Sequence, residues 1–194
     1  MTMGRHGAAI LAALLTLAAW APREGRGLLG TAAPEWSGIE WLHGGPLRLE
    51  DLRGRVVLLR FWLIECPYCR RSAWALRAWA EAYRDDGLVV VGIHHPKSEE
   101  ARDPETVAAA ARDLGFDFPI GIDNAWTTVR AYGVGSVFKR FTSVSFLIDR
   151  DGIIRFVHDG GEYHADGGAG HEECAAAHRA LEAAIRRALG RDGR

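Results

Sequence analysis

Cysteine is scarce in this sequence, and neither sign of charge is in excess. Only 3 of the 194 residues are cysteines, too few for a fold held together by several disulfide bridges. Lys and Arg together number 24, Asp and Glu number 25, and the formal net charge is −1. A general nucleic-acid or membrane-surface binder needs surplus cations to neutralise phosphate groups, and this chain has none. We therefore expect no nucleic-acid partner.

The N-terminus also lacks a hydrophobic stretch long enough to span a bilayer comfortably. Residues 8–21 are apolar apart from one threonine, which is the length of a signal-peptide core rather than the ~20 residues of a membrane-spanning helix. The letters AWA at 19–21 fit a cleavage site, but Pro22 directly after them should hinder cleavage. We expect residues 1–33 to be a signal peptide or membrane anchor plus a linker, and residues 34–194 to be the folded domain. The alternative is a buried N-terminal core helix.

Both leading interpretations of the N-terminus predict export. The protein would be periplasmic, or tethered to the membrane on its extracytoplasmic side. That compartment is oxidising, so a cysteine pair could cycle there between dithiol and disulfide.

Apolar periodicity predicts strands that alternate with helices along the rest of the chain. The run at 56–62 is rich in β-branched and aromatic residues, which predicts a strand buried on both faces. Asp103 and Pro104 provide a cap and a first turn for a helix, and Asp151-Gly152 marks a hairpin. The expected strands are 39–49 (one or two), 56–62, 88–93, 118–122, 144–149 and 153–157, and the expected helices are 67–84, 104–114, 124–132 and 171–189. This order predicts an α/β fold, a mixed central sheet with helices on both faces.

Two of the three cysteines form the motif CPYC at 66–69, between the buried strand and the helix that follows it. Pro67 suits the first helical turn, and the free N–H groups of that turn, with the helix dipole, would stabilise a thiolate at Cys66. Cys69 lies on the same side of the turn. The pattern predicts Cys66 as the attacking thiol and Cys69 as the resolving thiol of dithiol–disulfide exchange. The alternatives are a zinc half-site, which lacks its second half, and a purely structural disulfide.

The residues around this motif resemble the redoxin branch of the thioredoxin superfamily, which includes the bacterial cytochrome-maturation thiol reductases. The segments that carry the resemblance are VLLRFW at 57–62 with CPYC at 66–69, LEDLRGR at 49–55 and FLIDRDG at 146–152. The similarity runs from about residue 39 to residue 189. It implies a thioredoxin-like three-layer sandwich and exchange with disulfide-bearing protein substrates. The sequence contains no cofactor motif, so we expect no cofactor and no metal, and a membrane thiol-transfer protein as the reductant.

Two residues depart from that family's pattern near the motif. Ser143 occupies the place of a cis-proline that faces the cysteines, and a cis peptide at a non-proline residue is costly, so we expect a trans peptide or a rearranged loop. Arg60 stands where thioredoxins carry a buried acid, and a cation there would favour a thiolate. Glu65 is the nearby acid, either an acid–base group or a solvated side chain.

The resemblance does not extend to peroxidases. Peroxiredoxins place a proline seven residues, and a Thr or Ser three residues, before the reactive cysteine. In this sequence those positions are Leu59 and Leu63. We therefore expect a peroxidase activity to be absent.

Histidines form two further groups. His94 and His95 follow the strand at 88–93, where one of them could lie near Cys66, although a polar loop start is the simpler interpretation.

The second group is denser and includes the third cysteine. His171, Cys174 and His178 share one face of the last predicted helix, with His158 and His164 before it. Sulfur and imidazole ligands together suit copper or zinc, so a metal-binding chaperone on a thioredoxin-like fold is the alternative function. A scatter of surface histidines around a Gly-rich loop is the simpler interpretation, with Cys174 as a free or packed thiol.

Overall fold

A six-stranded mixed sheet forms the centre of the computed structural model, which describes residues 25–135, 142–166 and 168–191. The strands are β1 (Glu40–His43), β2 (Val56–Trp62), β3 (Leu88–His94), β4 (Ile120–Ile122), β5 (Ser145–Ile148) and β6 (Ile154–His158). Their order in the sheet is β1-β4-β3-β2-β5-β6. The neighbours β2, β3 and β4 run parallel, whereas β1, β5 and β6 each pair antiparallel.

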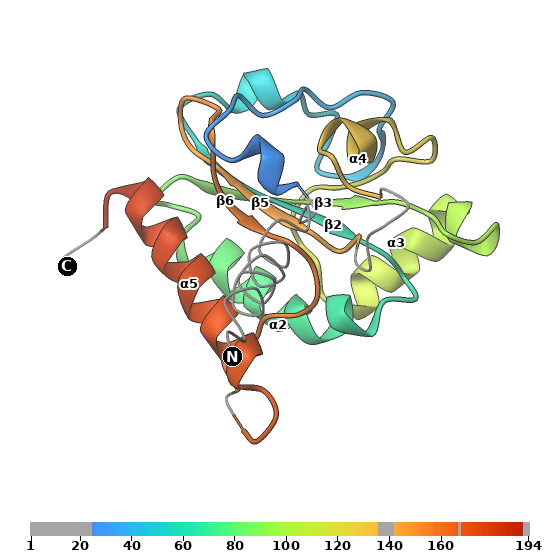
Figure 1. The fold of residues 1–194 in the computed structure, drawn as a ribbon. Coiled ribbons are helices and arrows are strands. Elements are labelled where there is room, and N and C mark those ends of the chain that lie inside the picture. Colours follow the sequence, from blue (N-terminus) through green and yellow to red (C-terminus); the bar gives the residue numbers. More distant parts are fainter. Residues whose placement is uncertain (1–24, 136–141, 167, 192–194) are drawn as a thin grey trace, which may run out of the picture.

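Helices cover both faces of this sheet (Figure 1). The α-helices are α2 (Pro67–Ala82), α3 (Pro104–Asp113), α4 (Thr127–Ala131) and α5 (Glu172–Leu189), and short 3₁₀ helices span Arg26–Leu28, Leu49–Leu52 and Glu100–Arg102. In Figure 1, α2, α3 and α5 lie on one face, and α4 lies on the other with the segment before β2. The predicted three-layer α/β architecture is confirmed.

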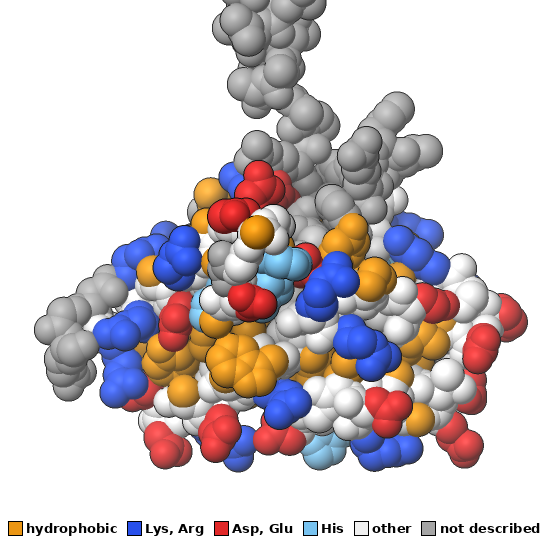
Figure 2. Space-filling view, turned by 90° about the horizontal axis from the view of Figure 1, so that it is seen from below, with side chains coloured by type: hydrophobic (Ala, Val, Ile, Leu, Met, Phe, Trp, Pro, Cys, Tyr) orange, Lys and Arg blue, Asp and Glu red, His pale blue; other side chains and the backbone are white. Residues whose placement is uncertain are grey.

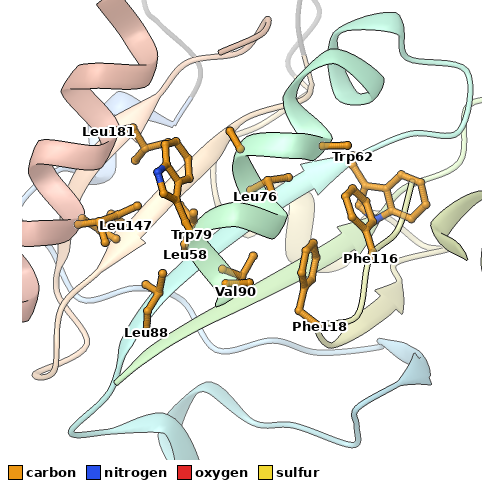
Figure 3. Close-up of a cluster of buried hydrophobic side chains, with 14 of the residues drawn as sticks. Leu58, Trp62, Leu76, Trp79, Leu88, Val90, Phe116, Phe118, Leu147 and Leu181 are labelled. Carbon is orange, nitrogen blue, oxygen red and sulfur yellow. The ribbon is translucent and has the colours of Figure 1, made fainter. Parts of the chain in front are cut away.

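Strand β2 runs through the middle of the molecule and contributes side chains to a hydrophobic core on each side of the sheet. All of its residues are buried, as predicted, and successive side chains point to opposite faces. The face toward α2, α3 and α5 receives Val56, Leu58 and Trp62, and the face toward α4 receives Val57, Leu59 and Phe61. Figure 3 shows the first core, where Trp79 of α2 points toward Leu181 of α5 and Leu58 of the sheet. The same alternation places Arg60 on the α2 side.

Several predicted elements are shorter than expected, and two of them by four residues or more. Residues 39–49 contain only the four-residue β1, because Gly44 adopts a left-handed φ of 65° and Pro46 has no N–H to continue the ladder. The predicted helix at 124–132 is limited to α4. The buried Asp123 carboxylate accepts the N–H groups of Thr127 and Val129, at 2.9 and 2.8 Å, and so sets where α4 begins.

The described chain already contacts the sheet ahead of the predicted domain start at residue 34. The N–H of Gly30 donates to the carbonyl of Ile154 at 2.8 Å, Ala32 bridges Ile153, and Ala33 is buried. The signal peptide or anchor lies outside the described residues, apart from the end of the linker, and its boundary stays a prediction. In the described part of the chain, no helix has the length and apolar character that a membrane span needs.

Candidate active site

The motif CPYC lies at the junction of β2 and α2, as predicted. Cys66 is the N-cap of α2 and Pro67 occupies the first turn. The Cys66 sulfur accepts the backbone N–H of Cys69 at 3.3 Å, so one of the free N–H groups of the helix start points at it. Cys66 is half-buried and Cys69 is buried, and both are thiols in this structure. The first sulfur is accessible and the second lies behind it.

The two thiols have opposite acidities. A hydrogen bond from the Cys69 side chain lowers the pKa of Cys66 to about 6, against the opposing effect of partial burial; the Cys69 N–H, the charge of Arg60 and the Ser143 hydroxyl act in the same direction. Burial, followed by the hydrogen bond to Cys66, raises the pKa of Cys69 well above its ordinary value. At neutral pH the pair therefore holds one thiolate, on Cys66, and one thiol, on Cys69.

Arg60 is a buried cation beneath the pair. The residue is 1% exposed, and its Nη2 lies 3.9 Å from the Cys69 sulfur. The guanidinium also donates to Ser145 Oγ at 3.2 Å and to the Gly161 carbonyl at 3.0 Å. Its Cζ lies 5.1 Å from the centre of the Tyr163 ring. The sequence predicted that a cation at this position would favour the thiolate if it points at the site. The guanidinium does point at the site, and its charge lowers the pKa of Cys66.

Ser143 faces Cys66 and has a trans peptide, as predicted. The Thr142–Ser143 peptide is not among the cis bonds of the described residues, which comprise only Gly45–Pro46. The Ser143 side chain hydrogen-bonds Cys66 and is one of the groups that lower its pKa, after those of Cys69 and the charge of Arg60. Ser143 thus stands where the family has a cis-proline, and its hydroxyl hydrogen-bonds the attacking sulfur.

A groove of about 530 Å³ opens beside Cys66. It is lined by Leu63, Glu65, Cys66, Pro67, Tyr68, Lys97, Ser98, Thr142 and Ser143. Glu65 is exposed and accepts a hydrogen bond from Ser98 Oγ at 2.7 Å. It therefore anchors the segment after β3 at the rim of the groove.

His94 and His95 are core residues. Both are fully buried, which differs from the polar loop start that the sequence suggested. His94 Nε2 lies 2.9 Å from the Ala101 carbonyl, and the His95 ring packs edge-on against Phe61 and Trp126. Burial lowers the pKa of both histidines, which keeps them neutral. The sequence signal for this burial is the continuous apolar run of β3, which leads directly into these two positions.

The other histidine group is divided by the fold. Glu162, His164, His171 and Cys174 gather before and at the start of α5, each offering one ligand atom within 4.8 Å of the others. His178 instead stacks on Trp79, with ring centres 4.8 Å apart, and His158 packs edge-on against Tyr163. Figure 2 shows histidine side chains beside acidic ones on the face that carries α2 and α5. Sequence reasoning did not single out Glu162 or Tyr163, because neither belongs to a motif.

Residues 29–157 of the chain match the AhpC/TSA family. Protein DipZ of Mycobacterium bovis is 36% identical over 137 residues, which cover 68% of this chain but only 19% of DipZ, so the chain spans about a fifth of that relative. Thiol-disulfide oxidoreductase ResA of Geobacillus thermodenitrificans is 31% identical over 134 residues, 68% of this chain and 70% of ResA.

A similar solved structure comes from Chlorobium tepidum, from a protein described as a thiol:disulfide interchange protein DsbE. It has a TM-score of 0.66 and 27% identity, and the match covers 83% of this chain and 97% of that one. The thioredoxin-like fold expected from the sequence is confirmed by this likeness. Because the family match covers more than half of its length, and because it covers 70% of a ResA relative that is 31% identical to it, the chain belongs to the AhpC/TSA family.

Proposed function

We propose that the chain is an exported thiol–disulfide oxidoreductase that exchanges a Cys66–Cys69 dithiol or disulfide with disulfide-bearing proteins. The observation that carries this proposal is the opposite acidity of the two thiols. The pKa of Cys66 is lowered to about 6 while that of Cys69 is raised. The accessible Cys66 thiolate can attack a disulfide, and the protonated Cys69 thiol can then resolve the mixed disulfide that forms.

In the reducing direction, the Cys66 thiolate attacks one sulfur of the partner's disulfide. A bond forms between Cys66 Sγ and that sulfur, and the other partner sulfur leaves as a thiolate and takes up a proton. Cys69 then loses its thiol proton and attacks Cys66 Sγ, which releases the second partner sulfur as a thiol. The partner gains two electrons and two protons, and the chain is left with a Cys66–Cys69 disulfide. The oxidising direction runs the same steps in reverse.

Arg60 supports the second attack. The Cys69 thiol is buried, so its deprotonation in an apolar environment would be costly without a counter-charge. The guanidinium 3.9 Å from the Cys69 sulfur provides that charge at the moment the thiolate forms. This function differs from that of an acid, which would accept the proton itself.

The groove beside Cys66 suits a protein segment as the partner. It is open, it combines the apolar Leu63 and Pro67 with the polar Ser98 and Ser143, and the attacking sulfur lies at its edge. The resulting disulfide needs a reductant, for which we propose a membrane thiol-transfer protein. We propose disulfide rather than peroxide as the substrate, because buried leucines occupy the two positions that peroxiredoxins use before the reactive cysteine.

The proposal is tested by redox titration of the purified chain, with thiol trapping and mass spectrometry. We expect a reversible Cys66–Cys69 disulfide with a midpoint within the range of roughly −350 to −100 mV that spans known oxidoreductases. The Cys69→Ser variant should accumulate a mixed disulfide at Cys66 when given an oxidised protein, and the matched Cys66→Ser variant should not. A titration without a reversible disulfide would contradict the proposal.

Export is tested separately by joining alkaline phosphatase, which is active only outside the cytoplasm, to the C-terminus of the full chain. Phosphatase activity in cells is expected, and the mass of the recovered N-terminus distinguishes a cleaved signal from a retained anchor. A fusion that is expressed but inactive would contradict export while leaving the thiol chemistry untouched.

A further inference from the structure

Four potential metal ligands converge beside the redox pair, on the loop after β6 and the start of α5. They are Glu162 and His164 from the loop, His171 at the N-cap of α5, and Cys174 in its first turn. One ligand atom from each lies within 4.8 Å of all the others. Side chains that meet in this way over thirteen positions of sequence depend on how the loop folds back onto the helix.

The Glu162 carboxylate is held so that one oxygen faces the other three ligands. Its Oε2 is bound by the Nε of Arg71 from α2, and its Oε1 accepts from Cys174 Sγ at 3.4 Å. The same Oε1 lies 4.0 Å from His171 Nδ1, and only 11% of the Glu162 side chain is exposed. The carboxylate is therefore oriented by an outer partner, as ligating carboxylates in metal sites are.

Two imidazole nitrogens of this group are buried without a hydrogen-bond partner among the described residues. They are His164 Nε2 and His171 Nδ1, and the two rings meet with centres 5.0 Å apart. Buried polar atoms normally find a partner, and these two nitrogens have none among the described residues. The two nitrogens lie next to a thiol and an oriented carboxylate, and the four together form a set of electron-pair donors that fits a cation.

We propose that Glu162, His164, His171 and Cys174 bind one Zn²⁺ ion. The set provides one oxygen, two nitrogens and one sulfur, which are the ligand types of zinc, and four protein ligands make a closed tetrahedral site of the structural kind. Zinc bonds of about 2.0–2.3 Å require the four atoms to draw together from their present separations by side-chain rotation. On binding, the Cys174 thiol releases its proton to solvent, and thiolate and carboxylate together balance the charge of the ion.

The site is distinct from the redox pair but shares a segment with it. The Gly161 carbonyl accepts from Arg60 at 3.0 Å, and the N–H of Tyr163 donates to Ser72 Oγ at 3.0 Å. Glu162, between them, turns the other way, toward the ligands. A zinc ion on Glu162 would therefore hold in place the backbone that positions the guanidinium next to Cys69. The proposal does not depend on the redox activity.

The test uses the full chain with Cys66→Ser and Cys69→Ser, which removes the thiols that would otherwise compete for metal. We expect this protein, stripped with a chelator, to bind one equivalent of Zn²⁺ in a competition titration with a chromophoric chelator. Co²⁺ in place of zinc should give the d–d bands of a tetrahedral site and a thiolate charge-transfer band. Adding Cys174→Ser should remove the charge-transfer band, and His164→Ala should abolish stoichiometric binding.

Arg71→Gln sharpens the test, because removing the partner that orients a ligand typically weakens metal binding by about 10–100-fold. The matched control is His43→Ala, an exposed histidine on β1 far along the chain from the group, which should bind as the parent does. Circular dichroism of each variant verifies that it is folded.

Two outcomes would overturn the proposal. They are the absence of stoichiometric zinc uptake, and uptake that survives both Cys174→Ser and His164→Ala in folded protein. Failure of the redox titration described above would leave this result unaffected, since the metal is measured without Cys66 and Cys69.

Discussion

The starts of helices α2 and α5 each carry a cysteine at the third helical position, with different surroundings. At α2 the N-cap is Cys66, with Cys69 three residues on, and at α5 the N-cap is His171, with Cys174 three residues on. Both therefore place a thiol in the first turn of a helix, where free N–H groups and the helix dipole favour an anion. The difference lies in the charge that tertiary structure brings to each.

A buried cation faces the first helix start and a carboxylate faces the second. Arg60 reaches Cys69, whereas Glu162 reaches Cys174. Burial raises the pKa of both first-turn thiols, Cys69 and Cys174, and Glu162 raises that of Cys174 further. Only the first helix start adds an N-cap thiol, Cys66, whose pKa is lowered to about 6. A helix start alone does not make a thiol nucleophilic. The neighbouring charges and hydrogen bonds decide between exchange chemistry and ligand chemistry.

The largest expected effect comes from removing the thiolate at the first helix start. Cys66→Ala should lose all measurable disulfide exchange, because the attack requires a thiolate and Cys69 is buried and protonated. Turnover is followed with an oxidised protein substrate and a chemical reductant. The control is Glu81→Ala, an exposed position later on α2, which should keep the parent rate. Activity remaining in Cys66→Ala would mean that another thiol attacks.

The next largest effect is the pH dependence of Cys66. With a pKa of about 6, its thiolate fraction, and so its alkylation rate, should rise about tenfold between pH 5 and pH 7 and then level off. Below the pKa the thiol is protonated and slow, so the rate falls toward acid. The rate is measured with iodoacetamide and peptide mapping.

Ser143→Ala should shift the midpoint of this pH profile to higher pH, because one of the groups that lower the Cys66 pKa is lost. The shift should be smaller than that in Arg60→Met, which removes a full charge. If the profile is centred above pH 8 in the parent, the comparison of the two helix starts no longer holds.

Arg60→Met sharpens the role of the cation. Arg60 acts after Cys69 in lowering the Cys66 pKa and so stabilises the reduced, thiolate form. Without it we expect a disulfide that is harder to reduce, with a potential more negative by about 30 mV, equivalent to about 1.4 kcal/mol. The potential is measured against glutathione buffers. Arg60→Lys, which keeps the charge, should retain more of the parent potential, and equal potentials in all three proteins would contradict this role.

The smallest expected effect concerns Tyr163, which lies in the segment shared by the two sites. Its hydroxyl is buried and lies 3.0 Å from Ser145 Oγ. Tyr163→Phe should lower the free energy of unfolding by about 1 kcal/mol, the net value of a typical hydrogen bond. Urea denaturation measures the loss. A double-mutant cycle with Ser145→Ala tests whether the two hydroxyls are coupled, and additive losses would show that they are not.

Much of the fold followed from local patterns. The apolar run at 56–62 predicted β2 with its observed bounds, and Asp103 with Pro104 predicted the start of α3. The pattern was less reliable around α4, whose N-cap is Trp126. The buried Asp123 carboxylate accepts N–H groups of its first turn from a position that periodicity does not mark. For His94 and His95, residue polarity suggested exposure, while their place at the end of a fully enclosed strand buried them.

The sequence by itself determined the position of the candidate redox pair. A strand that must be buried, followed directly by a cysteine, a proline and a helix, places Cys66 at the helix start whatever the rest of the chain does. The sequence left open whether Arg60 points at this pair, and the structure shows that it does, with Nη2 3.9 Å from the Cys69 sulfur.

Only the tertiary structure decided which charges surround each thiol. The segment at 161–163 returns between α2 and α5, so that Gly161 meets Arg60 while Glu162 meets Arg71 and Cys174. These contacts join residues as many as 101 positions apart, and no periodicity or motif in the chain records them. Charge–charge and hydrogen-bond energies depend on distance in space, and so the chemistry of Cys66 and Cys174 is a property of the packed molecule.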